Sequence, residues 1–141
     1  MDVARKLLIL ARETGIELEI KDISIEQILP PNCVKAKTVE DFFKELEIST
    51  SVFEARRAKA EEKNKVLRFI ALLENEKASI RLLEVDANHP FYNLSGSDNI
   101  VSFTTERYHD RPLVVKGPGA GAEVTAAGVF AEIISIGNYF E

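Results

Sequence analysis

The stretch Val66-Leu-Arg-Phe-Ile-Ala-Leu-Leu-Glu-Asn-Glu-Lys-Ala-Ser-Ile-Arg-Leu-Leu-Glu-Val85 decides the fold of this chain. Residues 66–73 and 78–85 are apolar runs of the kind that β-strands accept, and the polar residues 74–77 join them. Two such runs around a short polar connection predict a β-hairpin. The residues before the hairpin follow a helical period and the residues after it alternate, so the secondary structure changes here.

Helical patterns precede the hairpin. Residues 2–14 carry apolar side chains at helical spacing, and Gly15 is placed to end that helix. Thr38-Val-Glu-Asp41 resembles a capping box and predicts a helix to about Glu47, and Ser51-Val-Phe-Glu54 predicts a second helix to about Asn64. Between these helices, residues 18–20 alternate as a short strand would, and residues 24–29 suggest a single turn before two prolines.

Strand patterns follow the hairpin. Residues 99–106 alternate, residues 112–116 form a further apolar run, and residues 123–136 have a helical pattern. Helices that lead, followed by consecutive strands, predict an α+β fold with a largely antiparallel sheet. We expect helices to pack on one face of this sheet, with one more helix at the C-terminal end.

The run Lys116-Gly-Pro-Gly-Ala-Gly-Ala122 joins the last predicted strand to the last predicted helix. Glycines allow backbone N–H groups to approach a ligand closely, and a helix start adds unpaired N–H groups and partial positive charge. Such a turn suits a phosphate, a carboxylate or a flat polar ring. A tight connection that binds nothing explains the same residues, because the run does not match the dinucleotide fingerprint.

Asp2 and Lys6 lie four residues apart, on one face of the first predicted helix. This spacing is common for a surface ion pair that has no chemical role. Oxidation of a hydroxyl by hydride loss also needs a base for the proton, and a lysine can serve if its surroundings favour the neutral form. A neighbouring carboxylate works in the opposite direction, and it suits the ammonium group of a substrate better. The residues alone leave both interpretations open.

Composition excludes several classes of function. The chain has 141 residues, 45% of them hydrophobic, which is enough for one globular core. A net charge of −5 disfavours nucleic acid as a partner. No apolar run has the length of a membrane helix, and no signal peptide is evident. His89 and His109 are too isolated to predict a metal site. Cys33, the only cysteine, predicts a structural or surface thiol and not a nucleophile, and a single cysteine suits a cytoplasmic location.

Separated motifs resemble one known family. Residues 112–134, which include the Gly-rich run, are similar to the C-terminal signature of homoserine dehydrogenases, most of all those fused behind aspartokinase. The opening Asp2-Val-Ala-Arg-Lys6 resembles the catalytic segment of the same family. His89-Pro-Phe-Tyr-Asn-Leu-Ser-Gly-Ser-Asp-Asn99 and Thr105-Glu-Arg-Tyr108 lie between them in the matching order.

The resemblance implies roles for four residues. The position of Lys6 is the acid–base lysine of the family, and the position of Asp2 binds the substrate. Gly121, with Gly119 as the next candidate, matches a glycine that contacts the nicotinamide cofactor, NADP or NAD. That cofactor is expected to be bound mainly by a Rossmann domain outside these residues.

The resemblance also implies a domain organisation. Residues 1–116 correspond to part of the substrate and catalytic domain, and residues 117–141 to a loop and helix that pack on the nucleotide-binding domain. A homodimer through the sheet domain is expected.

The predicted function is that of a fragment of an NAD(P)-dependent oxidoreductase. The parent enzyme would interconvert L-homoserine and L-aspartate 4-semialdehyde in the biosynthesis of threonine, methionine and isoleucine, and the fragment alone would be inactive. The alternative is a stand-alone module that binds a small amino acid or dimerises without catalysis. A Rossmann domain encoded upstream would favour the enzyme.

Overall fold

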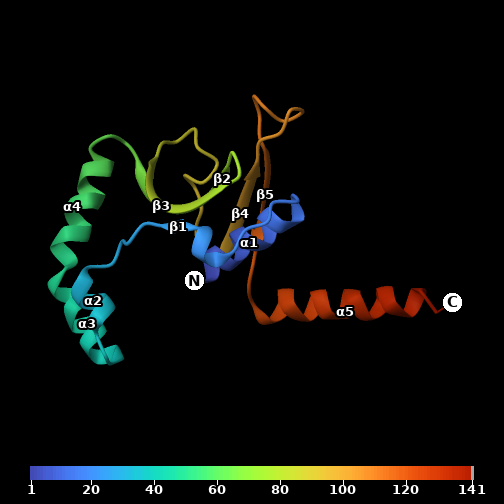
Figure 1. Ribbon diagram of the computed structural model, residues 1–141, viewed down its shortest axis with the longest axis horizontal. Coiled ribbons are helices and arrows are strands. Elements are labelled where there is room, and N and C mark those ends of the chain that lie inside the picture. Colours follow the sequence, from blue (N-terminus) through green and yellow to red (C-terminus); the bar gives the residue numbers. More distant parts are fainter. Residues whose placement is uncertain (141) are drawn as a thin grey trace. The chain divides into compact units, whose positions relative to one another are not determined.

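The computed structural model describes residues 1–140, and the chain divides into two compact units, Met1–Ala87 and Asn88–Glu141 (Figure 1). Each unit is described by itself. The first contains α1 (Asp2–Glu13), the 3-10 helix η1 (Ile20–Asp22), β1 (Ser24–Ile25), α2 (Pro31–Lys35), α3 (Val39–Ile48), α4 (Thr50–Glu61), β2 (Val66–Glu74) and β3 (Lys77–Val85). The second contains β4 (Asp98–Phe103), β5 (Leu113–Pro118) and α5 (Ala122–Asn138).

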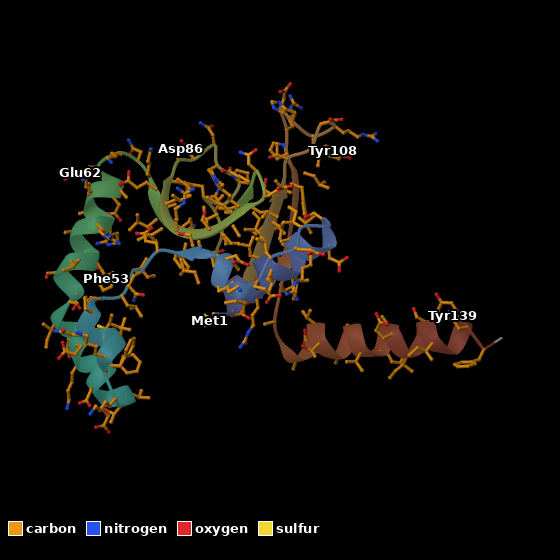
Figure 2. The ribbon with its side chains drawn as sticks, viewed as in Figure 1. Met1, Phe53, Glu62, Asp86, Tyr108 and Tyr139 are labelled. Atoms are coloured by element: carbon orange, nitrogen blue, oxygen red, sulfur yellow. The ribbon has the colours of Figure 1, made fainter. Side chains whose placement is uncertain are left out.

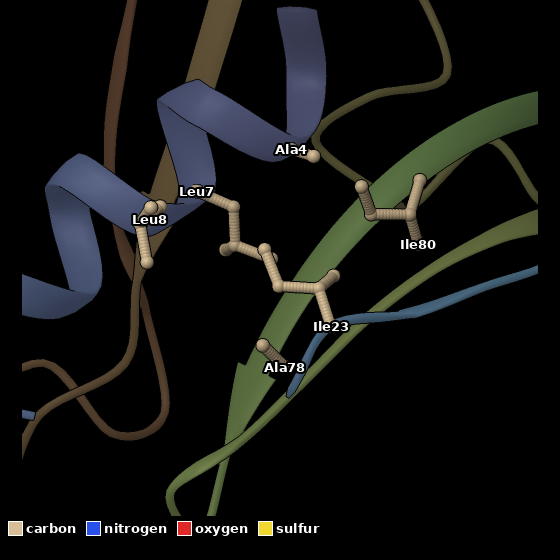
Figure 3. Packing of buried hydrophobic residues seen from close by; sticks show 6 residues of the cluster. All are labelled: Ala4, Leu7, Leu8, Ile23, Ala78 and Ile80. Carbon is tan, nitrogen blue, oxygen red and sulfur yellow. The ribbon is translucent and has the colours of Figure 1, made fainter. Parts of the chain in front are cut away.

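A three-stranded sheet in the order β1-β3-β2 organises the first unit. β2 pairs antiparallel with β3, and β1 pairs parallel with β3 on its other edge. The apolar stripe of α1 packs on this sheet, and Figure 3 shows Leu7 extending toward Ile23 and Ala4 facing Ile80. The buried cluster consists of Ala4, Leu7, Leu8, Ile23, Ala78 and Ile80.

The predicted hairpin is confirmed, and its turn is shorter than the polar connection suggested. Glu74 pairs with Lys77, so only Asn75 and Glu76 connect the strands. Both residues have positive φ, 50° and 62°, as a type I′ turn requires. Its backbone twist matches that of the two strands, which explains why pairing extends to the turn.

The first helix begins and ends as predicted. Gly15 has φ +83°, and its N–H donates to the Arg12 carbonyl at 3.0 Å. The N–H of Ile16 donates to the Ala11 carbonyl, also at 3.0 Å. These two bonds form a Schellman motif, which satisfies the last carbonyls of the helix and requires a residue such as glycine in the left-handed region.

Two predictions for residues 18–29 are wrong. Residues 18–20 form no strand, because Ile20–Asp22 is a 3-10 helix whose N-cap is Glu19. The turn expected at residues 24–29 is instead the strand β1, in which Ser24 pairs with Ser79 and Ile25 with Ile80. Pairing with a strand more than fifty residues away decides this segment, and a local pattern carries no signal of it.

The start of α3 is confirmed and the start of α4 is not. The Thr38 hydroxyl accepts a hydrogen bond from the backbone N–H of Asp41 at 3.1 Å, as an N-cap should. α4 begins at Thr50 with Ser49 as N-cap, so the capping box predicted at Ser51 does not form. Ser49 instead donates its hydroxyl to the Glu45 carbonyl at the end of α3, and the two helices follow each other without a loop.

The second unit is an antiparallel pair of strands followed by a long helix. Asp98 pairs with Pro118 and Phe103 with Leu113, as the predicted strands require. The predicted final helix is present, and none of its described residues is buried. Figure 2 shows its side chains projecting along the helix as far as Tyr139.

The α+β class is confirmed, with the strands divided between a mixed sheet and an antiparallel pair. α1 covers one face of the mixed sheet, as expected for the leading helix. Among residues 1–140, no helix combines the length and the apolar character needed to cross a membrane.

Candidate functional site

Asp2 and Lys6 meet in the first turns of α1. The Lys6 Nζ lies 3.0 Å from the Asp2 Oδ2, and both side chains are largely exposed, at 55% and 76% respectively. The opposite stripe of the helix, which includes Ala4 and Leu7, is buried against the sheet. The amphipathic pattern that anchors α1 therefore also turns this pair outward, where a substrate can reach it.

The pair offers two different kinds of contact. The Asp2 carboxylate accepts hydrogen bonds and attracts a cation such as the ammonium group of an amino acid. The Lys6 ammonium can donate a hydrogen bond or a proton to an oxygen. The pair thus presents an acceptor and a donor side by side on one turn of the helix.

The Gly-rich turn follows β5 directly. Gly117 and Pro118 are the last residues of that strand and pair with Asn99 and Asp98 of β4. The Gly119 N–H then donates to the carbonyl of Ser97, the residue before β4, at 3.5 Å, so backbone contact continues one step beyond both strands.

The two candidate glycines of this turn differ in their surroundings. Gly121, the N-cap of α5, has φ 137° and ψ 154°, a conformation that is essentially restricted to glycine. A Cβ built on Gly121 meets no atom within 4 Å, so this side of the turn is open. A Cβ on Gly119 would overlap the amide nitrogen and Cγ of Asn99 and would lie 3.2 Å from the Asn99 Cβ. The open position is the one that suits close approach of a ligand.

The predicted residues fall into two separate places. Asp2 and Lys6 are together in the first unit, and Gly119 and Gly121 are together in the second. Asn99 was not singled out by sequence reasoning as a neighbour of the turn. Its contact depends on the β4–β5 register, and its place at the end of the polar residues 93–99 was the only available signal. Within residues 1–140, no group of three or more His, Cys, Asp or Glu side chains is arranged to hold a metal ion.

The comparisons with known proteins define the class. The sequence matches the family model for homoserine dehydrogenase over residues 1–134. This match covers nearly the whole chain and includes both the Asp2–Lys6 pair and the Gly-rich turn. The chain therefore belongs to the homoserine dehydrogenase family.

The relatives include a protein named as a homoserine dehydrogenase alone and proteins named as bifunctional aspartokinase/homoserine dehydrogenases. The chain is 46% identical to a homoserine dehydrogenase of Schizosaccharomyces pombe, over 96% of this chain and 37% of that protein. It is 42% identical to the chloroplastic bifunctional aspartokinase/homoserine dehydrogenase 2 of Zea mays, over 98% of this chain and 15% of that protein. The chain thus spans well under half the length of these relatives.

Solved structures agree with the fold. A Candida auris protein of unknown function superposes with a TM-score of 0.86 at 40% identity, over 97% of this chain and 39% of that one. The homoserine dehydrogenase of S. aureus superposes with a TM-score of 0.65 at 17% identity, over 99% of this chain and 31% of that one. The second comparison concerns the fold alone.

Proposed function

We propose that this chain supplies substrate-binding and catalytic residues to an NAD(P)-dependent homoserine dehydrogenase, which interconverts L-homoserine and L-aspartate 4-semialdehyde. The observation that carries the proposal is the Asp2–Lys6 pair, joined at 3.0 Å on the exposed face of α1 inside the segment that matches the family. A carboxylate and an ammonium at this spacing provide the two functions that the reaction asks of the protein: capture of an amino acid and transfer of a proton.

The roles follow from the chemistry of the substrate. Oxidation of homoserine removes a hydride from the carbon that bears the hydroxyl and a proton from the hydroxyl oxygen. Lys6 exchanges this proton with the oxygen, and Asp2 holds the substrate ammonium.

The Gly-rich turn fits a nicotinamide. Gly121 presents a backbone with no side chain and with open space on the side where a Cβ would stand. When bound, the nicotinamide of NAD or NADP accepts or donates the hydride. Gly121 would lie against the ring, and Gly119 would support the turn. We expect most of the cofactor to be held by a nucleotide-binding domain outside these residues.

Residues 117–141 are proposed to pack on that nucleotide-binding domain, while residues 1–116 belong to the substrate and catalytic domain. α5 carries large apolar side chains that are more than half exposed, such as Phe130 at 65% and Ile133 at 58%. A helix with this much apolar surface needs a partner surface. The 141-residue polypeptide alone should therefore lack dehydrogenase activity, because hydride donor and acceptor are not aligned.

A homodimer through the first unit is part of the proposal. β2 is an edge strand of the sheet in the described structure, nine residues long and mostly apolar. A long, apolar edge invites pairing with another strand, and two-fold dimers are the commonest soluble assembly.

The cytoplasmic location also stays a prediction, and the name of the maize relative assigns that protein to the chloroplast.

The test compares two polypeptides. Homoserine-dependent reduction of NAD⁺ or NADP⁺ is measured for the full protein that carries these residues and for residues 1–141 alone. We expect activity in the full protein only. Binding of homoserine by both polypeptides, without cofactor reduction by either, would favour a stand-alone amino-acid-binding module instead.

A further inference from the structure

We infer that Asn99 is a positioning residue for the Gly-rich turn. Its side chain fills the space over Gly119 that any other residue would need for its Cβ, and this contact holds the backbone that leads to Gly121 and α5. The inference rests on the proposed function in one respect, namely that the turn contacts the nicotinamide. The packing contact itself does not depend on that function.

The β4–β5 register brings Asn99 to this position. Asn99 lies directly opposite Gly117 in the antiparallel pair, so their side-chain positions share one face of the ribbon. Gly117 offers no side chain there, and a Cβ built on it meets nothing within 4 Å. Gly119 is the diagonal neighbour two residues further along. The asparagine side chain extends toward Gly119 and leaves the space beside Gly117 open.

The contact is tight at more than one atom. A methyl group on Gly119 would overlap the amide nitrogen and Cγ of Asn99, and would lie 3.2 Å from the Asn99 Cβ. The severe overlaps are with the amide group of Asn99. The Asn99 Cβ at 3.2 Å is closer than ordinary van der Waals contact, but a shift of a few tenths of an ångström relieves that contact. The Gly119 N–H also donates a hydrogen bond to the carbonyl of Ser97, the residue that precedes β4.

Gly119 and Gly121 therefore lack a side chain for different physical reasons. Gly119 has no side chain because Asn99 occupies that space. Gly121 has none because of its backbone conformation, and its open side remains available to a ligand. Asn99 acts on the cofactor only through the position of the turn, so it is not a catalytic residue.

A steric rescue experiment in the full protein tests this assignment. Gly119→Ala should lower Tm by about 2–8 °C, as overpacking does. It should lower kcat/KM for the cofactor by about 10–100-fold through displacement of the turn. The same substitution in an Asn99→Ala background should lose most of both effects. In an Asn99→Asp background, where the side chain keeps its shape, both effects should remain. Asn99→Ser serves if Asn99→Ala does not fold.

Gly117→Ala is the matched control within the turn. Its Cβ has open space, so its effect on Tm should be small and independent of residue 99. Equal losses from Gly119→Ala in the Asn99 and Asn99→Ala backgrounds would overturn the inference. If Tm follows the rescue pattern while cofactor affinity does not change in any variant, the packing contact stands, and the proposed nicotinamide contact of the turn is overturned.

Discussion

The Glu26 carboxylate extends the parallel pairing of β1 with β3 by accepting a hydrogen bond from the backbone of Leu82. Its Oε2 accepts a hydrogen bond from the backbone N–H of Leu82 at 3.0 Å, while its own N–H donates to the Ile80 carbonyl at 2.9 Å. β1 ends one residue earlier, at Ile25. The side chain thus takes the place of the next backbone carbonyl that a longer strand would have provided, and it satisfies a part-buried donor of β3.

Glu26→Ala should destabilise the fold, because it leaves the Leu82 N–H without this acceptor. We expect a loss of about 1–3 kcal/mol, the usual range for a hydrogen bond to a charged group. Chemical denaturation monitored by circular dichroism measures it. Glu26→Gln keeps an acceptor oxygen and should recover most of the loss. Arg56→Ala should have little effect, since Arg56 lies 4.0 Å from the Glu26 carboxylate in a partly exposed pair.

The Lys63–Glu84 ion pair predicts a pH dependence. The Lys63 Nζ donates to the Glu84 Oε2 at 2.8 Å, and this hydrogen bond lowers the pKa of the Glu84 carboxyl from its usual value. A carboxyl whose pKa is lower in the folded state stabilises the fold above its unfolded pKa, about 4.3 for glutamate. That stabilisation is lost as the pH falls through the lowered value.

The stability difference between wild type and Glu84→Gln should therefore be small but present at pH 7 and should disappear in acid. Urea midpoints measured from pH 7 to pH 3 give the comparison. Glu47→Gln, on the exposed surface of α3, controls for removal of a negative charge. A difference that stays constant over the whole range would show that the ion pair contributes nothing.

Lys6→Ala in the full protein should lower kcat by about 10²–10⁴, the usual contribution of a general acid–base group. The KM for the cofactor should hardly change, because Lys6 acts on the substrate oxygen. Asp2→Ala should mainly raise the KM for homoserine. Arg57→Ala removes two comparable exposed ion pairs, with Glu54 and Glu61 on another helix, and should leave kcat unchanged. If Lys6→Ala retained kcat within a few-fold of wild type, Lys6 would be only a surface lysine.

Gly121→Ala and Gly128→Ala should act in opposite directions. At Gly121 the backbone has φ 137°, so a side chain costs about 1–3 kcal/mol in strain although the surrounding space is open. The turn should relax, and cofactor affinity should fall. Gly128 lies within α5 with open space around it, where alanine favours the helix by about 0.5–1 kcal/mol. Cofactor titration and helix content by circular dichroism distinguish the two outcomes.

Hydrogen exchange should divide the chain into slow and fast regions. The amides of β3, the central strand of its sheet, should be strongly protected in the 141-residue polypeptide. Those of α5 should exchange much faster, since none of its described residues is buried and most helical stability in proteins comes from tertiary packing. Equal protection of α5 and β3 in a verified monomer would show that α5 needs no further partner.

Most of the fold could be predicted because its signals are local. The stripe of α1 and Gly15 after it define that helix, and Thr38 marks the start of α3, each within a few residues. The hairpin follows from two apolar runs with a polar connection. The Asp2–Lys6 contact is also local, since four residues span one helical turn. Family resemblance, and not geometry, supplied the roles that we assign to this pair.

The errors concern segments whose partners are distant in the sequence. β1 forms because Ser24 and Ile25 pair with the edge of β3 that β2 does not occupy, and the sequence of residues 24–29 does not predict that pairing. The α4 start moved to Thr50 because Ser49 serves the end of α3 and the start of α4 together. The sequence also did not predict why residue 119 is a glycine, since Asn99 reaches it only in the observed register of β4 and β5.

The sequence by itself determined most of the helices and strands, the family of the chain and the Asp2–Lys6 contact on α1, because periodicity, capping residues and short motifs act over one or two turns. Tertiary structure alone decided that Glu26 completes the sheet edge, that Asn99 covers Gly119 and that Gly121 stands open. These contacts depend on register and on pairing between distant strands, where a shift of one residue would carry every side chain to the opposite face.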